Sequence, residues 1–337
     1  MASESTAPDA HRDAATLRGR LEALIGQAQV SADYVRFRAD LLTAQWQTYH
    51  AVPPSPAVAD SAAPQAAHRP RLGPASVRFD PELLRPLLAA IAAAAARHGS
   101  GSRDATQLVA AADRDPTVLE RVSASAAFDP DGEELGLLAG EVGASPEGLV
   151  FLGRTLAAPF VTRAAARWVA ELPPTDVTDR GAEGQGAPEE TASLPTSGGS
   201  AGASPSQVAR SPTPGCAPGA CPVCGSPPGL AELRRDDGQR VLHCSLCGTG
   251  WRFARLACPD CGVREPGALG FLRLGAEDPR WVETCTTCRG YIKTVDARKL
   301  PAGPPFAALV EDTATLHLDL LAEREGCGRR RPYAALW

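Results

Sequence analysis

Four Cys-x-x-Cys pairs in the last third of this 337-residue chain constrain its fold more than any other feature. A Cys-x-x-Cys turn can present two thiolates to one metal ion, and two such turns complete a tetrahedral four-cysteine site. Buried free thiols would not repeat the same two-residue gap four times, and a thioredoxin-like redox pair needs a βαβ context that is absent here. The sequence therefore predicts two metal sites, whose ligands are Cys221, Cys224, Cys244, Cys247, Cys258, Cys261, Cys285 and Cys288.

The spacing of the pairs indicates which of them share a metal. The intervals between successive pairs are 19, 10 and 23 residues; the first is typical of a zinc ribbon and the last is slightly long. Cys-Pro-x-Cys-Gly begins at Cys221 and again at Cys258, and each is followed by a plainer pair and then by an aromatic and a basic residue. This internal repeat of about 40 residues favours two sequential modules with one metal each. The alternative is a cross-braced arrangement, in which the first pair joins the third and the second joins the fourth.

The spacing identifies the ligands but not the metal, because four-thiolate sites suit zinc and rubredoxin-type iron equally well. Closed coordination leaves no position for water or substrate, which argues against metal-centred hydrolysis. The chain also has no Ser/His/Asp set and no phosphate-binding glycine loop, so we expect that it is not an enzyme. Cys216 and Cys327 complete no ligand set. His243 is interpreted as an exposed strand residue, with a hydrogen bond to the first site as the alternative.

Composition and charge restrict the compartment and the partners. All ten cysteines follow residue 215, whereas a secreted disulfide framework would not leave two thirds of the chain without a cross-link. The net charge of −5 gives no global case for binding nucleic acid or an anionic membrane. No apolar run approaches the roughly 20 residues that span a bilayer, and residues 1–20 lack the apolar core of a secretory signal. We therefore expect a cytoplasmic protein without membrane insertion.

Helix signals dominate residues 1–175, which we predict to form an all-α bundle of five to seven helices. Apolar residues recur with helical periodicity between residues 34 and 46. Helix starts of the form Asp-Pro-Glu and Ser-Pro-Glu follow at residues 80–82 and 145–147, and Gly99 can end the first of these helices. Pro159 is expected to kink or split the second. Shorter helices are expected between residues 104 and 139, and the apolar stripes are interpreted as core.

The rest of the chain divides into four segments. Residues 176–214 are rich in Gly, Ser, Thr and Pro, and are predicted to be a flexible linker. The first metal module covers 215–256, the second 257–300, and a C-terminal helix and tail 301–337. The C-terminal helix begins with acids near Glu311 and can end at Gly326. We expect it to dock the modules against the bundle; the alternative is that its acidic face contacts a partner. The predicted fold class is multi-domain α+β: an all-α N-terminal domain, two tandem rubredoxin-like or zinc-ribbon modules and a C-terminal helix.

Residues 221–326 resemble the FdhE family of formate dehydrogenase accessory proteins. The resemblance rests on CPVCGSP at 221–227, CSLCGTGW at 244–251, CPDCG at 258–262, CTTCRGYIK at 285–293 and EDTATLHLDLLAE at 311–323. It implies a helical domain followed by two rubredoxin-like or zinc-ribbon modules, with the same eight cysteines as ligands of iron or zinc. It also implies a cytoplasmic, chaperone-like protein that binds the catalytic subunit of formate dehydrogenase before twin-arginine export. The chain departs from the family pattern in its long 176–214 segment and in Cys327, where an aromatic residue is expected.

Two other functions compete with that of an accessory protein. A nucleic-acid-binding zinc ribbon is one, yet residues 221–300 carry 12 Lys/Arg and 9 Asp/Glu, and eight thiolates with two divalent ions contribute a further charge of about −4. A local basic patch could still form from Arg234, Arg235, Arg252 and Arg255. A rubredoxin-like redox carrier is the other, and it is compatible with partner binding. The sequence does not decide whether the metals change redox state, which surface binds a partner, or whether the chain forms a homodimer.

Overall fold

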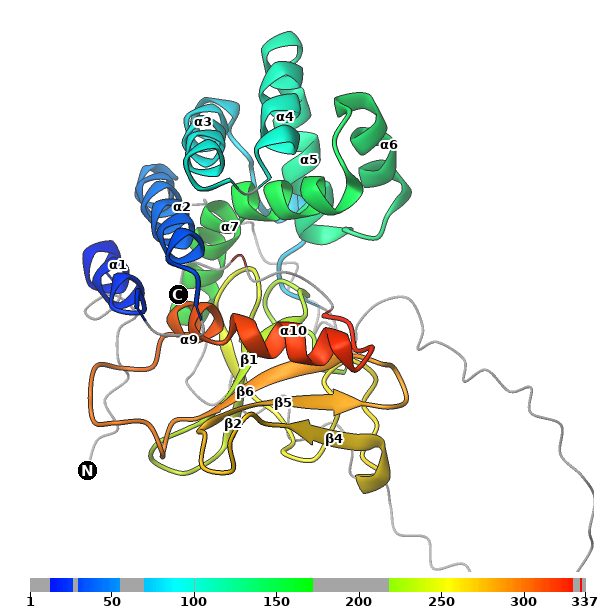
Figure 1. Ribbon diagram of the computed structural model, residues 1–337. Helices are drawn as coiled ribbons and strands as arrows, with labels where there is room; N and C mark the ends of the chain where they lie inside the picture. Colours follow the sequence, from blue (N-terminus) through cyan, green and yellow to red (C-terminus); the bar gives the residue numbers. More distant parts are fainter. Residues whose placement is uncertain are drawn as a thin grey trace, which may run out of the picture.

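The computed structural model describes residues 13–26, 30–54, 70–99, 101–171, 218–329 and 334. Within these ranges, a helical N-terminal part and a sheet-containing C-terminal part lie against each other (Figure 1). Two further helices, α9 and α10, lie over the sheet on the side that faces the helical part. The segment 176–214, predicted to be a linker, and Cys216 fall outside the described residues.

The N-terminal part contains the predicted helices. Their bounds are α1 Ala14–Glu22, α2 Ala32–Ala51, α3 Pro81–His98, α4 Ser102–Arg114, α5 Thr117–Phe128, α6 Glu133–Val142 and α7 Pro146–Glu171, with a short 3₁₀ turn at Pro74–Ser76. The start and end signals of α3 act as expected. Asp80 Oδ1 accepts a hydrogen bond from the Glu82 amide at 3.0 Å, and Gly99 ends the helix in a left-handed conformation with φ 73°. The prediction of an all-α region is confirmed.

Helix α7 is a single helix of 26 residues that contains Pro159, so the proline does not split it as one of the two expected outcomes would have required. Its middle is almost entirely buried and packs on α2 and α5, so packing outweighs the hydrogen bond that the proline removes. Residues 146–166 have the length and composition of a membrane span, but 78% of this apolar window is buried inside the fold. This burial is that of a core helix.

The C-terminal part is built on one six-stranded sheet with the order β3-β2-β1-β6-β5-β4. The strands are β1 Pro228–Leu233, β2 Arg240–Cys244, β3 Gly250–Arg252, β4 Leu269–Leu272, β5 Arg280–Cys285 and β6 Tyr291–Asp296, and a 3₁₀ turn at Pro266–Ala268 precedes β4. Each sequence repeat supplies an antiparallel three-stranded meander. The meanders join where β1 and β6 pair in parallel, with Ala231 opposite Thr294. The two predicted modules therefore share a sheet.

A buried ion pair reinforces the junction between the modules. Arg240, at the start of β2, is 3% exposed, and its Nη1 donates to the carbonyl oxygens of Ala254 and Ala257 at 3.0 and 2.9 Å. Its Nη2 donates to Glu283 Oε2 at 2.7 Å, and the Thr294 hydroxyl donates to the other carboxylate oxygen at 2.9 Å. The guanidinium thus holds the connection between the modules against the strands of the second module.

Two helices follow the sheet where a single C-terminal helix was expected: α9 Ala308–Ala314 and α10 Leu316–Arg324. They meet at Thr315, whose hydroxyl donates to the carbonyl of Glu311 at 2.7 Å; such a bond to the preceding turn bends a helix. Helix α9 packs in a core with α1 and α2, and α10 covers β5 and β6. The docking role is confirmed. The acids do not form an exposed partner-binding face, because Glu311, Asp312 and Asp319 are buried.

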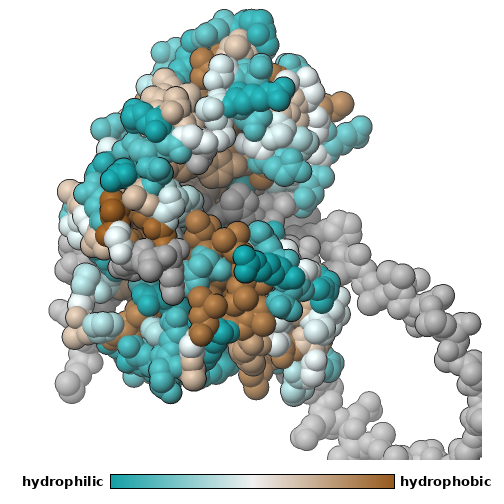
Figure 2. All heavy atoms as spheres, in the orientation of Figure 1, coloured by the Kyte–Doolittle hydropathy of each residue, from teal (hydrophilic) through white to brown (hydrophobic). Residues whose placement is uncertain are grey.

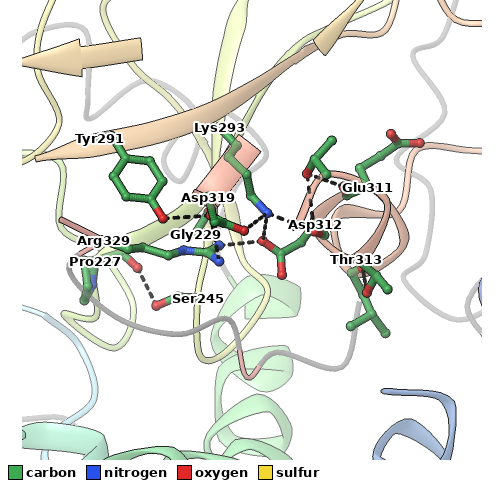
Figure 3. A network of polar contacts seen from close by, with 12 residues as sticks. Pro227, Gly229, Ser245, Tyr291, Lys293, Glu311, Asp312, Thr313, Asp319 and Arg329 are labelled. Carbon is green, nitrogen blue, oxygen red and sulfur yellow. Dashed lines mark hydrogen bonds and ion pairs between the residues drawn. The ribbon is translucent and has the colours of Figure 1, made fainter. Parts of the chain in front are cut away.

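Lys293 on β6 is the centre of a buried polar network beneath α9 and α10 (Figure 3). It is 1% exposed, and its Nζ lies 2.8 Å from both Asp312 Oδ1 and Asp319 Oδ2. Arg329 pairs with both carboxylates and donates to the carbonyl of Gly229 at 2.8 Å. Two acids and two bases thus neutralise one another, which is the condition for keeping charges inside a fold.

The charges in this network determine the ionisation of Asp312. Burial raises the pKa of this carboxyl, but the positive charges of Arg329 and Lys293 outweigh burial and hold the pKa well below the usual 3.8. A carboxyl with a lowered pKa in the folded state stabilises the fold fully above its unfolded pKa. This stabilisation is lost as the pH falls below about 4 toward the folded value.

We expect Lys293→Met to lower the free energy of unfolding by about 3 kcal/mol at neutral pH, because two buried carboxylates lose their shared partner. Urea unfolding of the metal-loaded protein, followed by circular dichroism, measures the change. The loss should shrink as the pH falls below about 4, because protonation removes the charge that a buried Asp312 carboxylate without its lysine would leave uncompensated. Lys299→Met is the matched control, because this lysine is exposed and its ion pair with Glu277 spans 3.8 Å. Equal effects of the two substitutions would show that the network does not stabilise the fold.

Candidate metal centres

The structure brings the eight predicted cysteines together in two groups of four. The first cluster is Cys221, Cys224, Cys244 and Cys247, and the second cluster is Cys258, Cys261, Cys285 and Cys288. Within each cluster all four sulfur atoms lie within 4.8 Å of one another. The grouping is that of two sequential modules, so the cross-braced alternative is wrong.

The distances between sulfur atoms fit a tetrahedral metal ion. A metal–sulfur bond of about 2.3 Å places the corners of the tetrahedron about 3.8 Å apart. The pairs Cys221–Cys247 and Cys224–Cys244 are separated by 3.7 and 3.4 Å, and both measured pairs of the second cluster by 3.7 Å. Each group can therefore hold one zinc or one rubredoxin-type iron with thiolate ligands alone.

Each Cys-x-x-Cys pair forms a tight turn that ends in a left-handed residue. The four residues are Gly225, Gly248, Gly262 and Arg289, with φ of 76°, 72°, 77° and 57°. Their position is the same in every turn, directly after the second cysteine. In the closing turn of the first cluster, the amides of Leu246 and Cys247 both lie 3.4 Å from Cys244 Sγ, where they stabilise the thiolate. The repeated turn explains why glycine follows three of the four pairs.

A proline packs against the opening turn of each cluster. Its close approach is a second reason why glycine is needed after the second cysteine of that turn. A Cβ on Gly225 would lie 2.8 Å from Pro70 Cγ, and a Cβ on Gly262 would lie 2.9 Å from Pro218 Cγ. The segment that carries Pro70 also donates from the Leu72 amide to the Val223 carbonyl at 2.7 Å. Both opening turns are therefore covered in the same way, each by a proline from a segment that lies elsewhere in the sequence.

The two clusters differ in their surroundings. All four cysteines of the first cluster are buried and belong to the main hydrophobic core, together with side chains of the helical part. In the second cluster, Cys258 and Cys285 are buried but Cys261 and Cys288 are only half-buried, and the cluster lies outside that core. The first cluster is thus part of the interface between helices and sheet, and the second is peripheral.

The four thiols of one cluster cannot all ionise without a cation. Burial raises the pKa of Cys221 and of Cys247 well above 9.0, whereas the hydrogen bond from the Cys221 thiol lowers the pKa of Cys224. In the second cluster, the hydrogen bond from the Cys258 thiol lowers the pKa of Cys288 to about 4, and burial raises that of Cys261 to about 11. A metal ion removes this competition, so its binding must release protons.

The other candidate ligands lie apart from the clusters. His243 Nε2 is 3.0 Å from Glu232 Oε2, and its half-buried ring packs on Phe306, so the predicted exposed strand position is wrong and its polar partner is a carboxylate. Cys327 is buried in the small core between α10 and the sheet. Arg154 is a further residue near the first cluster that the sequence did not predict: it is buried in α7, and its Nη2 donates to the hydroxyl of Ser245, beside Cys244, at 2.8 Å. A charged residue between apolar residues of the helix was its only signal.

Comparison with known proteins places the metal modules in a defined group. Residues 220–255 match the FdhE central domain, and residues 257–336 match the FdhE C-terminal domain. The FdhE homologue of Aquifex aeolicus is 37% identical over 109 residues, which are 32% of this chain and 38% of that protein. The FdhE protein of Escherichia coli strain K12 is 36% identical over 112 residues, 32% of this chain and 35% of its own length. The matched segment therefore spans little more than a third of these relatives.

A solved structure extends the likeness to the helical part. The crystal structure of the FdhE protein from Pseudomonas aeruginosa matches this chain with a TM-score of 0.50 over 94% of both chains, at 21% sequence identity. At this identity the match supports the fold. The helical region, the sheet and the C-terminal helices thus form a fold that occurs in a second protein.

We expect a chelator to remove metal from the second cluster before the first, because two of its thiols are half-exposed whereas the first cluster is buried. Protein loaded with two cobalt ions should lose its thiolate-to-cobalt absorbance in a fast and a slow phase when EDTA is added. Cys261→Ser disables the second cluster, so the fast phase should disappear and only the slow phase should remain. A single rate for both ions in the unsubstituted chain would contradict this expectation.

Proposed function

Because the chain belongs to the FdhE family through residues 220–336, we propose that it is a cytoplasmic accessory factor that binds the catalytic subunit of a formate dehydrogenase. The observation that carries the proposal is the coincidence of the two matched domains with the two four-cysteine clusters and the sheet that joins them. The proposed organisation is a helical domain (1–175), a linker (176–214), metal modules (215–256 and 257–300) and a C-terminal segment (301–337).

The eight clustered cysteines are the proposed ligands of two metal ions. The sulfur distances and the all-thiolate donor set support zinc or rubredoxin-type iron. Zinc would stabilise the turns and the core around them, and iron would add a one-electron redox couple. The chain's own part is to position the sulfurs through four equivalent turns and to keep water from the first cluster.

We propose a binding function without catalysis. Four thiolates fill the coordination of each metal, so no position is left to activate water or substrate. In the described ranges, the buried acids Asp312 and Asp319 are neutralised by Lys293 and Arg329, which makes them structural supports. Phe271, Leu274 and Leu320 are more than half exposed, and apolar residues gather over the C-terminal part below α10 (Figure 2). Exposed apolar side chains of this kind fit a protein partner.

A nucleic-acid-binding function is weakened by the contacts of the arginines that could serve it. Arg234 pairs with Asp236 and Asp237. Arg235 donates to the carbonyl of Pro301 at 3.0 Å, and Arg255 donates to the carbonyl of Gly238 at 3.4 Å. Guanidinium groups held in this way contribute less to a positive surface that follows phosphates.

A redox function is the second candidate, and the second cluster is the observation that favours it. Cys261 and Cys288 are half-buried, so an iron ion held there would lie close to solvent and within reach of an electron donor or acceptor. This function is compatible with partner binding, and it requires iron in place of zinc.

Binding to the catalytic subunit is tested with the two purified proteins. The metal-loaded chain is titrated with the formate dehydrogenase catalytic subunit of the same organism and the complex is followed by light scattering and size-exclusion chromatography. We expect a complex with a Kd in the micromolar range or below. The catalytic subunit of an unrelated molybdenum enzyme is the matched control. Equal binding to both subunits, or to neither at tens of micromolar, would overturn the proposal, and salt-dependent binding to DNA or RNA would favour the alternative.

Metal content and the visible spectrum of anaerobically purified protein test the ligand assignment. We expect about two metal ions per chain and a loss of about one ion in Cys288→Ser. Two irons with thiolate-to-iron charge-transfer bands would support a redox role, and two colourless zinc ions would make both sites structural. Less than one ion in a folded protein would be incompatible with the assignment.

A further inference from the structure

The two clusters follow the same pattern, which makes one difference between them informative. The residue after the first cysteine of the closing turn is Ser245 in the first cluster and Thr286 in the second. The amide and hydroxyl of Ser245 both donate to the carbonyl of Pro227, at 3.1 and 2.7 Å. Those of Thr286 both donate to the carbonyl of Ala268, at 2.9 and 3.4 Å. In each module a hydroxyl residue thus ties the closing turn to the residue that precedes the first strand.

A guanidinium reaches this hydroxyl in the first cluster. Arg154 of α7 is 0% exposed, and its Nη2 lies 2.8 Å from Ser245 Oγ. Because Ser245 uses its hydroxyl hydrogen on the carbonyl of Pro227, its oxygen accepts from the guanidinium. Thr286, in contrast, is exposed, so water is available to its hydroxyl. The same closing turn therefore contacts a buried guanidinium in the first module, whereas in the second module it is exposed to solvent.

A buried four-thiolate centre needs a positive charge near it. Four thiolates and one divalent ion together carry a charge of about −2, and a charge removed from water is costly unless another charge or hydrogen bonds compensate it. All four cysteines of the first cluster are buried in an apolar core. Solvent can compensate the negative charge of the half-exposed second cluster, but it does not have the same access to the buried first cluster. The guanidinium of Arg154 is a positively charged group that contacts the residue next to Cys244.

We propose that Arg154 is the counter-charge of the first metal centre and that, through Ser245, it raises the metal affinity of that centre and makes the two centres of the chain inequivalent. This inference rests on the proposed function of the eight cysteines as metal ligands. Arg154 is a positioning residue, because its contact is with the hydroxyl beside Cys244. Groups that contact and orient metal ligands typically change metal affinity 10- to 100-fold when they are replaced, and Arg154 acts one residue away from the ligand Cys244, so we expect an effect of about 10-fold.

The proposal also links the helical part to the metal. Arg154 belongs to α7, the helix that packs on α2 and α5, so the charge that stabilises the first centre comes from the other half of the molecule. If the bound ion is iron, the positive charge favours the more negative, reduced form of the centre. The reduction potential of the first centre should then fall when the charge is removed, whereas that of the second centre should not change.

The test uses the full chain with Cys261→Ser and Cys288→Ser, which leaves the first cluster as the single four-cysteine site. Cobalt(II) is the probe, and its affinity is measured by competition with a chelator while the thiolate-to-cobalt absorption band is recorded. We expect Arg154→Met to weaken cobalt binding about 10-fold and to shift the band, and Arg154→Lys to restore most of the affinity. Arg163→Met is the matched control, since Arg163 lies on the same helix and stacks over the Tyr49 ring.

The outcomes separate this inference from the ligand assignment on which it rests. Unchanged affinity and an unchanged band in Arg154→Met, or equal losses in Arg154→Met and Arg163→Met, would overturn the counter-charge proposal while leaving the ligands in place. Absence of a thiolate-to-cobalt band in the parent chain would instead contradict the ligands themselves. If Arg154→Met does not fold, Ser245→Ala is measured in its place: a weakened, band-shifted centre supports the proposal, and an unaltered one overturns it.

Discussion

The first four-cysteine cluster lies where the helical part, the sheet and the end of the chain meet, and their relative positions depend on it. The Leu72 amide donates to the carbonyl of Val223 in the opening turn, at 2.7 Å. Arg154 donates to Ser245 in the closing turn, and the amide of Ala334 donates to the carbonyl of the same serine at 2.8 Å. A metal ion held by these turns therefore fixes the surface to which three distant segments bind, and its binding energy becomes folding energy for the whole molecule.

A second set of contacts, separate from the metal ligands, joins the elements of the C-terminal part. The parallel pairing of β1 with β6 joins the two modules in one sheet, and the pair of Arg240 with Glu283 holds their connection against it. Lys293 and Arg329 then bind Asp312 and Asp319 beneath α9 and α10. The acidic segment at 311–319, which looks like a solvent-exposed face in the sequence, is thus buried against the sheet. The metals and the ion network thus stabilise the same sheet through separate sets of contacts.

The repeat yields two centres of the same construction in different environments. Each centre consists of two turns, and each turn ends in a residue of left-handed conformation. In both centres a proline packs against the glycine of the opening turn, and a hydroxyl group ties the closing turn to the residue before the first strand of the module. One centre is enclosed by the helical core and the other is open on one side. A buried centre is suited to holding the fold together, and a half-exposed one is suited to exchange with its surroundings. The difference in environment between the centres follows from the elements that pack on each, since the turns themselves are equivalent.

The sequence by itself determined the local features of this protein. Signals a few residues long determine the two ends of α3, at Asp80 and Gly99, and identify the eight clustered cysteines. A repeat of about 40 residues determines the sequential grouping of these cysteines. The tertiary structure alone decided the rest: the sheet shared by the two modules, the break at Thr315, the burial of Asp312, the continuity of α7 through Pro159 and the contact of Arg154 with the first cluster. These features depend on contacts between segments far apart in the chain, where burial and pairing outweigh local preference and leave no periodic pattern in the sequence.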